Sequence, residues 1–112
     1  MKINIYRGTS KWNPPILTVE KGKVYLGTNT WQSEIMTING NEIYKGSNTW
    51  NSPIAIVKGN EVYKGTNTWN TPIAIIYGQE VYEGTNKWNS PIAITEGGKM
   101  SGAVAAVFLL LM

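Results

Sequence analysis

The sequence predicts an all-β protein: a closed five-fold ring of β-hairpins, propeller-like in form, followed by a short apolar C-terminal helix. Three observations lead to this fold class. Similar residues recur every 19 positions through most of the chain. Each repeat holds two strand-like segments with a turn signal between them. The chain opens with one strand of the type that the last repeat lacks, and it ends in an apolar run.

The period is set by aromatic and branched residues. Tryptophan, tyrosine and isoleucine each recur in five positions that are 19 residues apart. Such self-similarity is typical of repeat proteins, whose units bury their apolar faces only against one another. The predicted domain covers residues 1–100, with units that start near Tyr6, Tyr25, Tyr44, Tyr63 and Tyr82.

The segment PIAIVKGNEVYKG, residues 53–65, predicts a β-hairpin. Its two halves are rich in β-branched and aromatic residues, and Gly59-Asn60 between them is typical of a tight turn. Pro53 opens the first strand, where no ladder donor is required. The intervening TNTWNS, residues 66–71 in this copy, is predicted to be a loop, and it contains the tryptophan.

The two ends of the chain favour a closed ring over an open solenoid, which would need a capping unit at each end. INIYRG at the start is a lone strand of the EVYKG type. Pairing of Ile3–Arg7 with Ile92–Thr95 would leave no free sheet edge, so this pairing is predicted. Gly97–Met100 stays open as an alternative local partner for the last strand.

The apolar tail, residues 101–112, is predicted to be helical, because Ala and Leu favour helices and Ser101 can cap one. Its run Gly102–Met112 would be about 16 Å long, too short to cross a bilayer. A helix that is apolar on every side should be buried all round. It either plugs the ring or packs against another subunit, and the sequence leaves both open.

Repeats of the form GNEVYKGTNTWNSPIAIV resemble those of small bacterial proteins described as five-fold β-flowers. The resemblance extends from Ile3 to about Met100. It implies that each hairpin is a petal around a central axis, and it implies no activity. Choline-binding and MORN repeats share part of the pattern, but their spacing of aromatic residues and their length fit less well.

Composition excludes several classes of function. The 112 residues include no Cys and no His, and all seven acidic residues are Glu. The commonest metal ligand and general base, histidine, is therefore missing, and so is the cysteine thiolate. No pair of glutamates stands out as catalytic, and no hydroxyl has a partner base, so neither enzymatic activity nor a cofactor is expected. The net charge of +3 comes from scattered lysines, so no nucleic-acid partner is expected. The N-terminus has no apolar signal segment, which predicts a cytoplasmic protein by default.

The tryptophans are the candidate functional residues. An indole face beside an Asn amide suits a sugar ring, which needs a flat apolar surface and directed hydrogen bonds. The candidate ligand-binding residues are Trp12, Trp31, Trp50, Trp69, Trp88, Asn51, Asn70 and Asn89. A structural interpretation is favoured over this one: each indole would wedge between neighbouring hairpins, while the Asn residues shape turns. The tyrosines are also interpreted as packing residues, with hydroxyls that reach solvent or a turn.

These features predict a non-enzymatic binding or interaction module with carbohydrate as the candidate ligand. The alternative is a structural protein whose apolar tail drives homo-oligomerisation. A glycan or a second copy of the chain is the expected partner, and no membrane span is expected.

Overall fold

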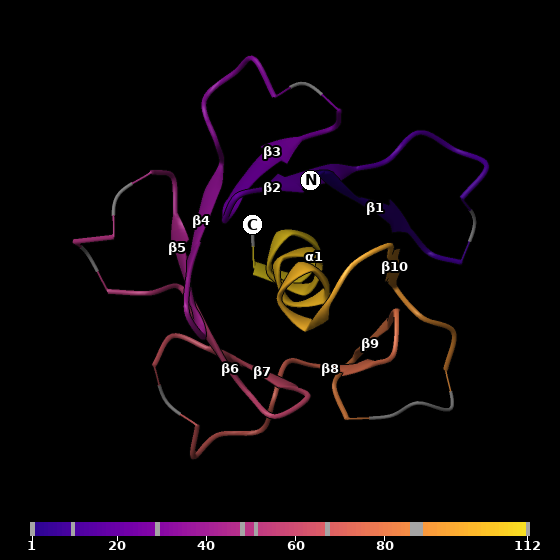
Figure 1. The fold of residues 1–112 in the computed structure, drawn as a ribbon. Helices are drawn as coiled ribbons and strands as arrows, with labels where there is room; N and C mark the ends of the chain where they lie inside the picture. The colour runs from indigo at the N-terminus through magenta and orange to yellow at the C-terminus, as the bar shows by residue number, and fades with distance from the viewer. Residues whose placement is uncertain are drawn as a thin grey trace.

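Ten strands form one closed barrel, and a helix runs through it (Figure 1). The computed structural model describes residues 2–9, 11–28, 30–47, 49–50, 52–66, 68–85 and 89–111. The strands are β1 (Lys2–Arg7), β2 (Leu17–Glu20), β3 (Lys23–Leu26), β4 (Met36–Asn39), β5 (Glu42–Lys45), β6 (Ala55–Lys58), β7 (Glu61–Lys64), β8 (Ala74–Tyr77), β9 (Glu80–Glu83) and β10 (Ala93–Thr95). The helix α1 spans Lys99–Leu111.

Each strand pairs antiparallel with the next one along the chain, and β10 pairs with β1 to close the barrel. Ile5 lies opposite Thr95 and Arg7 lies opposite Ala93. The predicted pairing of the two ends of the repeat region is therefore confirmed. The alternative partner, Gly97–Met100, is wrong, because these residues lead from β10 into the first turn of α1. Closure satisfies the backbone groups that an edge strand would expose.

The predicted hairpin over residues 53–65 is confirmed as β6 and β7, with Lys58 opposite Glu61. Gly59, the first of the two turn residues, has φ of 62°. Glycine at this position is typical of a type II′ turn, whose twist matches that of the flanking strands. The turn between β2 and β3 differs, because Lys21 and Gly22 both have positive φ, 54° and 79°, as in a type I′ turn.

Alternation along the strands builds the core. Ala55 and Val57 of β6 and Val62 of β7 face the interior and are almost fully buried. Equivalent residues of the other strands join them in one apolar cluster with Ala103–Val107 of α1. The tail therefore plugs its own barrel, which decides the question that the sequence left open.

The helix begins earlier than predicted. The carbonyl of Gly98 accepts hydrogen bonds from the N–H groups of Ser101 (3.1 Å) and Gly102 (3.3 Å). Ser101 is thus inside the first turn and buried, so its predicted role as the cap is wrong. Gly98, directly before the helix, takes the capping position, because the chain leaving β10 must turn at once to enter the barrel.

Differences among the repeats fit the barrel to this single helix. At one inward position the repeats hold Leu17, Met36, Ala55, Ala74 and Ala93, all fully buried. The helix packs mainly on β8, β9, β10 and β1, where two of the alanines leave room. A Cβ atom added at Gly102 would lie 3.2 Å from Val81 Cγ2 and 3.3 Å from Ile76 Cγ2. A larger residue at this position would therefore push Val81 and Ile76 aside, and glycine allows the close approach of α1 to β8 and β9.

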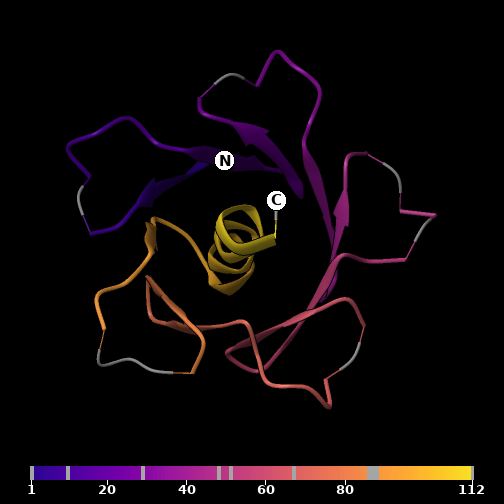
Figure 2. The same cartoon turned by 180° about the vertical axis from the view of Figure 1, so that it is seen from behind.

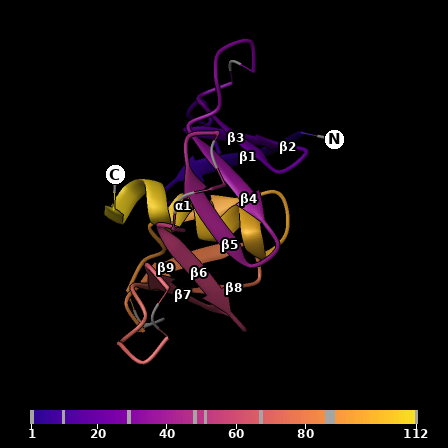
Figure 3. The same ribbon diagram turned by 90° about the vertical axis from the view of Figure 1, so that its left-hand side faces the viewer.

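The side view shows the direction of the helix. The N-terminus of the chain and the C-terminal end of α1 lie on opposite sides of the flat molecule (Figure 3). Since β10 ends at Thr95 beside the tight turns, α1 runs back through the barrel and ends at the opposite opening.

Candidate functional site

The segments that contain the tryptophans all lie at one end of the barrel, which we call the loop end. These loops span residues 8–16, 27–35, 46–54, 65–73 and 84–92. Because the strands alternate in direction, the tight turns lie at the other end. The loops extend outward from the barrel, around the central helix (Figure 2).

Backbone hydrogen bonds fix the base of each loop. Gly65 N–H donates to the carbonyl of Ile54, and Ile73 N–H donates to the carbonyl of Val62, both at 2.8 Å. Gly65 has φ of 68°, a conformation that glycine adopts without strain. Because Ile54 ends the preceding loop, the first bond ties one loop to the next. The same bond from Gly8 to Ile92, at 2.7 Å, closes the series across the two ends of the chain.

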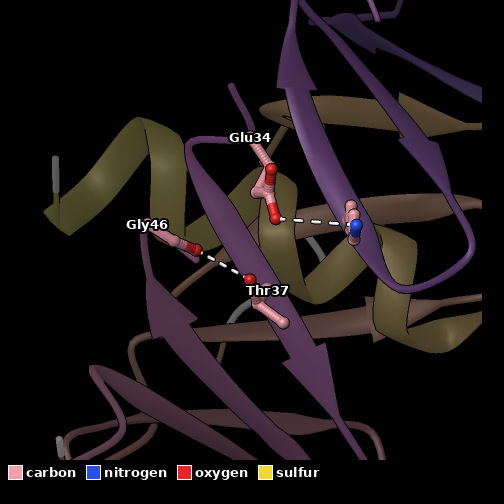
Figure 4. Close-up of polar contacts among 4 residues, drawn as sticks. Glu34, Thr37 and Gly46 are labelled. Atoms are coloured by element: carbon pink, nitrogen blue, oxygen red, sulfur yellow. Dashed lines mark hydrogen bonds and ion pairs between the residues drawn. The ribbon is translucent and has the colours of Figure 1, made fainter. Parts of the chain in front are cut away.

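Side chains also support the bases of the second and third loops (Figure 4). The Thr37 hydroxyl donates to the carbonyl of Gly46 at 2.7 Å. Glu34 stands where the other repeats have proline, and its Oε2 lies 3.9 Å from Lys23 Nζ. An ion pair at the surface contributes at most about 1 kcal/mol, so the backbone bonds dominate the loop base.

The described indoles are exposed. The exposed fraction is 97% for Trp12, 95% for Trp31 and 94% for Trp50 and Trp69. The interpretation of these tryptophans as wedges is therefore wrong. The loop residues that pack against the core are the partly buried isoleucines at the loop bases.

Two of the candidate asparagines share this environment. Asn70, which follows Trp69, is exposed, and so is Asn89. Trp88 and Asn51 lie outside the described residues. The structure thus brings the described candidates to the surface of separate loops at one end of the barrel, not into a single enclosed pocket.

The tyrosines pack on the outer face of the barrel wall, which confirms their interpretation as packing residues. Tyr63 is only 6% exposed, and its hydroxyl donates to Glu61 Oε1 at 2.5 Å. Two other repeats form the same contact, from Tyr44 to Glu42 and from Tyr82 to Glu80. The hydrogen bond to the carboxylate is the main cause that raises the pKa of these three tyrosines above its ordinary value, and burial adds to it.

A family model described as "6-fold beta flower protein" matches residues 5–108. The chain belongs to this family. The match includes the barrel wall and most of α1, so the resemblance to β-flower proteins is confirmed. The description gives six-fold symmetry, whereas the sequence of this beta flower protein holds five copies of its repeat. No curated protein and no solved structure matches the chain.

A second group of residues in this beta flower protein was missed by the sequence analysis. Val62 is fully buried in the barrel, so alternation places Lys64 on the same inward face at the loop end. Lys45 follows Ile43 in the same way. We call this opening of the barrel, where α1 ends, the mouth. Strand alternation already placed each lysine on the same face as Ile43 or Val62, but the sequence did not show which face of the strand was the inner one.

The described part of the chain contains no group of three His, Cys, Asp or Glu residues that could hold a metal ion. Among the same residues, no helix combines the length and the apolar character that a membrane span requires.

Proposed function

We propose that this beta flower protein is a non-enzymatic binding module whose contact surface is formed by the tryptophan loops, with carbohydrate as the ligand class. The observation that supports this proposal is the exposure of the four described indoles, 94–97% in each case. A large aromatic side chain contributes most to stability when it is buried. Exposure of the same residue in repeat after repeat is better explained by contact with a ligand than by packing.

Carbohydrate fits the chemistry of these loops. A sugar ring stacks its C–H face on an indole, and it needs hydrogen-bond partners at its edge. The exposed Asn70 amide beside Trp69 supplies a donor and an acceptor. Open single platforms of this kind bind weakly.

The spacing of the loops favours a repetitive ligand. The molecule measures 37 × 36 × 21 Å, and the loops extend from its rim. Several weak contacts made at once by one polymer, or by many glycans on a surface, would multiply in strength through a high effective concentration.

The number of binding loops follows from the repeat. We propose five petals in a propeller-like arrangement around α1, each made of two strands and one tryptophan loop. The five sequence repeats and the ten strands of the barrel support this number. It differs from the six-fold symmetry in the family description.

Assembly through the apolar tail is the competing function. Residues 101–107 of α1 are buried in the chain's own barrel, so among the described residues of the tail Phe108–Leu111 remain for contact with a second copy. The exposed indoles are the larger unexplained surface, and we therefore favour ligand binding.

The proposal is tested with the full chain on a glycan array, followed by calorimetric titration of the glycans that bind. Replacement of both Trp50 and Trp69 by Ala removes two of the five platforms, so it should weaken multivalent binding at least about ten-fold and leave the melting temperature almost unchanged. Tyr77→Ala is the matched control, because it removes an exposed aromatic residue from the tight-turn end. An array without any binder, or equal losses in the control, would refute carbohydrate binding through the loops.

A further inference from the structure

The off-centre position of α1 leaves part of the mouth open. The helix packs mainly on β8, β9, β10 and β1, and its last turn, Phe108–Leu111, is only partly buried. On the side of β5 and β7 a cavity of about 560 Å³ remains. Its lining residues are Lys45, Ile54, Lys64, Gly65 and Leu111. This volume lies within the range of roughly 300–1,000 Å³ that is usual for small-molecule sites.

The lining combines apolar and cationic groups. Ile54 and Leu111 supply apolar surface, and Gly65 adds no side chain that would fill the space. Lys45 is the last residue of β5 and Lys64 is the last residue of β7, and β6 lies between these two strands. Both lysines are on the inward face, so both ammonium groups lie at the mouth. Neither lysine forms an ion pair with a described residue, and no carboxylate is among the described residues that line the cavity.

The end of the helix accounts for part of this positive charge. The C-terminus of a helix is equivalent to about half a negative charge, and it attracts nearby cations. The corresponding positions of the five repeats hold Arg7, Leu26, Lys45, Lys64 and Glu83. Arg7 lines a second cavity, with Leu109 and Leu110, so the positive charge at the first cavity is that of Lys45 and Lys64. Two cations against about half a negative charge leave an excess of positive charge there.

We propose that this cavity binds a single-chain anionic amphiphile of the fatty-acid type. Its carboxylate would accept charge-assisted hydrogen bonds from Lys45 and Lys64, and its chain would cover Ile54 and Leu111. A sugar would leave the apolar lining without a partner, and a neutral chain would leave both lysines without one. The site is separate from the exposed indoles, so this proposal does not depend on carbohydrate binding.

The test is a calorimetric titration of the full chain with laurate, below its micellar concentration and at low ionic strength. We expect saturable binding of one laurate per chain, and about ten-fold weaker binding of dodecanol, which has the same chain without the charge. The double variant Lys45→Glu, Lys64→Glu should bind laurate at least about ten-fold more weakly. The control is Lys21→Glu, Lys58→Glu, which makes the same charge change in exposed residues at the tight-turn end.

Several results would overturn the proposal. They are the absence of saturable laurate binding, equal affinity for dodecanol, or an equal loss of affinity in the control variant. Binding to phosphatidylglycerol vesicles without binding of monomeric laurate would also overturn it, since the occupant would then be a lipid surface. Circular dichroism checks the fold of each variant. If the double variant does not fold, the comparison of laurate with dodecanol on the unchanged protein decides the matter.

Discussion

Replacement of Trp69 by Ala tests the central feature of the proposed function, the exposure of the loop indoles. About 6% of the residue's surface is covered, since 94% is exposed. A tryptophan offers up to about 250 Å² for burial, so about 15 Å² of contact would be lost. At about 25 cal/mol per Å² this loss amounts to about 0.4 kcal/mol of unfolding free energy. A tryptophan wedged in the core would instead cost about 3–5 kcal/mol.

The measurement is chemical denaturation of the wild type and the Trp69→Ala variant, followed by far-ultraviolet circular dichroism. Thermal unfolding of the same two proteins gives a second readout: the expected change in melting temperature is less than about 3 °C, whereas loss of a core wedge would lower it by more than about 10 °C. Ile43→Ala is the control, because this side chain is fully buried in the barrel. It should lower the unfolding free energy by about 2–5 kcal/mol.

Quenching of tryptophan fluorescence by acrylamide gives an independent check. Most of the emission should be quenched as readily as that of free tryptophan, because four of the five indoles are exposed. A loss of 2 kcal/mol or more in Trp69→Ala, or emission that resists the quencher, would refute the orientation of the indoles and with it the proposed binding surface.

Three further predictions concern the barrel. The pKa values of Tyr44, Tyr63 and Tyr82 are raised in the folded protein, so their protonated hydroxyls stabilise the fold below about pH 10. This stabilisation is lost as the pH rises through the folded-state pKa values, and the melting temperature should fall over that range. An absorbance titration should show three tyrosines that ionise late, and titration of all six near pH 10 would contradict the carboxylate contacts. Gly102→Val should lower the unfolding free energy by about 1–3 kcal/mol through overlap with Val81 and Ile76, and an unchanged value in denaturation would exclude the close helix packing. Lys21→Asn should raise it by about 0.5 kcal/mol, because Asn-Gly is preferred in a type I′ turn, and a decrease would argue against that turn.

The barrel wall could be predicted from the sequence because local chemistry specifies it. A glycine-containing tight turn fixes the register of each hairpin, as Lys58 opposite Glu61 illustrates. The lone first strand and the unpaired last strand then have only each other as long-range partners. The order of segments therefore favours the pairing of β1 with β10, and only the structure excludes Gly97–Met100 as the partner of the last strand.

The direction of the tryptophans could not be predicted in the same way. The 19-residue period shows that each indole has the same position in its loop. It does not show which way the indole points, because a buried wedge and an exposed platform would both recur with this period. The decision depends on the loop base, where Ile54 and Ile73 form backbone hydrogen bonds and pack against the core. The bond from Ile73 to Val62 spans the whole loop and has no local signature in the sequence. The prediction that Ser101 caps α1 was wrong for a related reason. The helix enters the barrel directly after β10, so Ser101 lies within its first turn and is buried.

The departures from the repeat are as informative as the repeat itself. One helix cannot make equal contacts with every strand of a barrel around it, so a barrel of identical repeats would leave either a clash or a void. Leu17 and Met36 fill the side that α1 leaves, while Ala74, Ala93 and Gly102 allow its close approach on the other. Ala55 is small as well, although the helix packs less closely on β6. The cavity at the mouth lies beside this strand, bounded by Ile54 and the two lysines. The larger of the two described cavities at the mouth thus lies where the small inward Ala55 is not matched by close helix packing, and Lys45 and Lys64 lie at the same place.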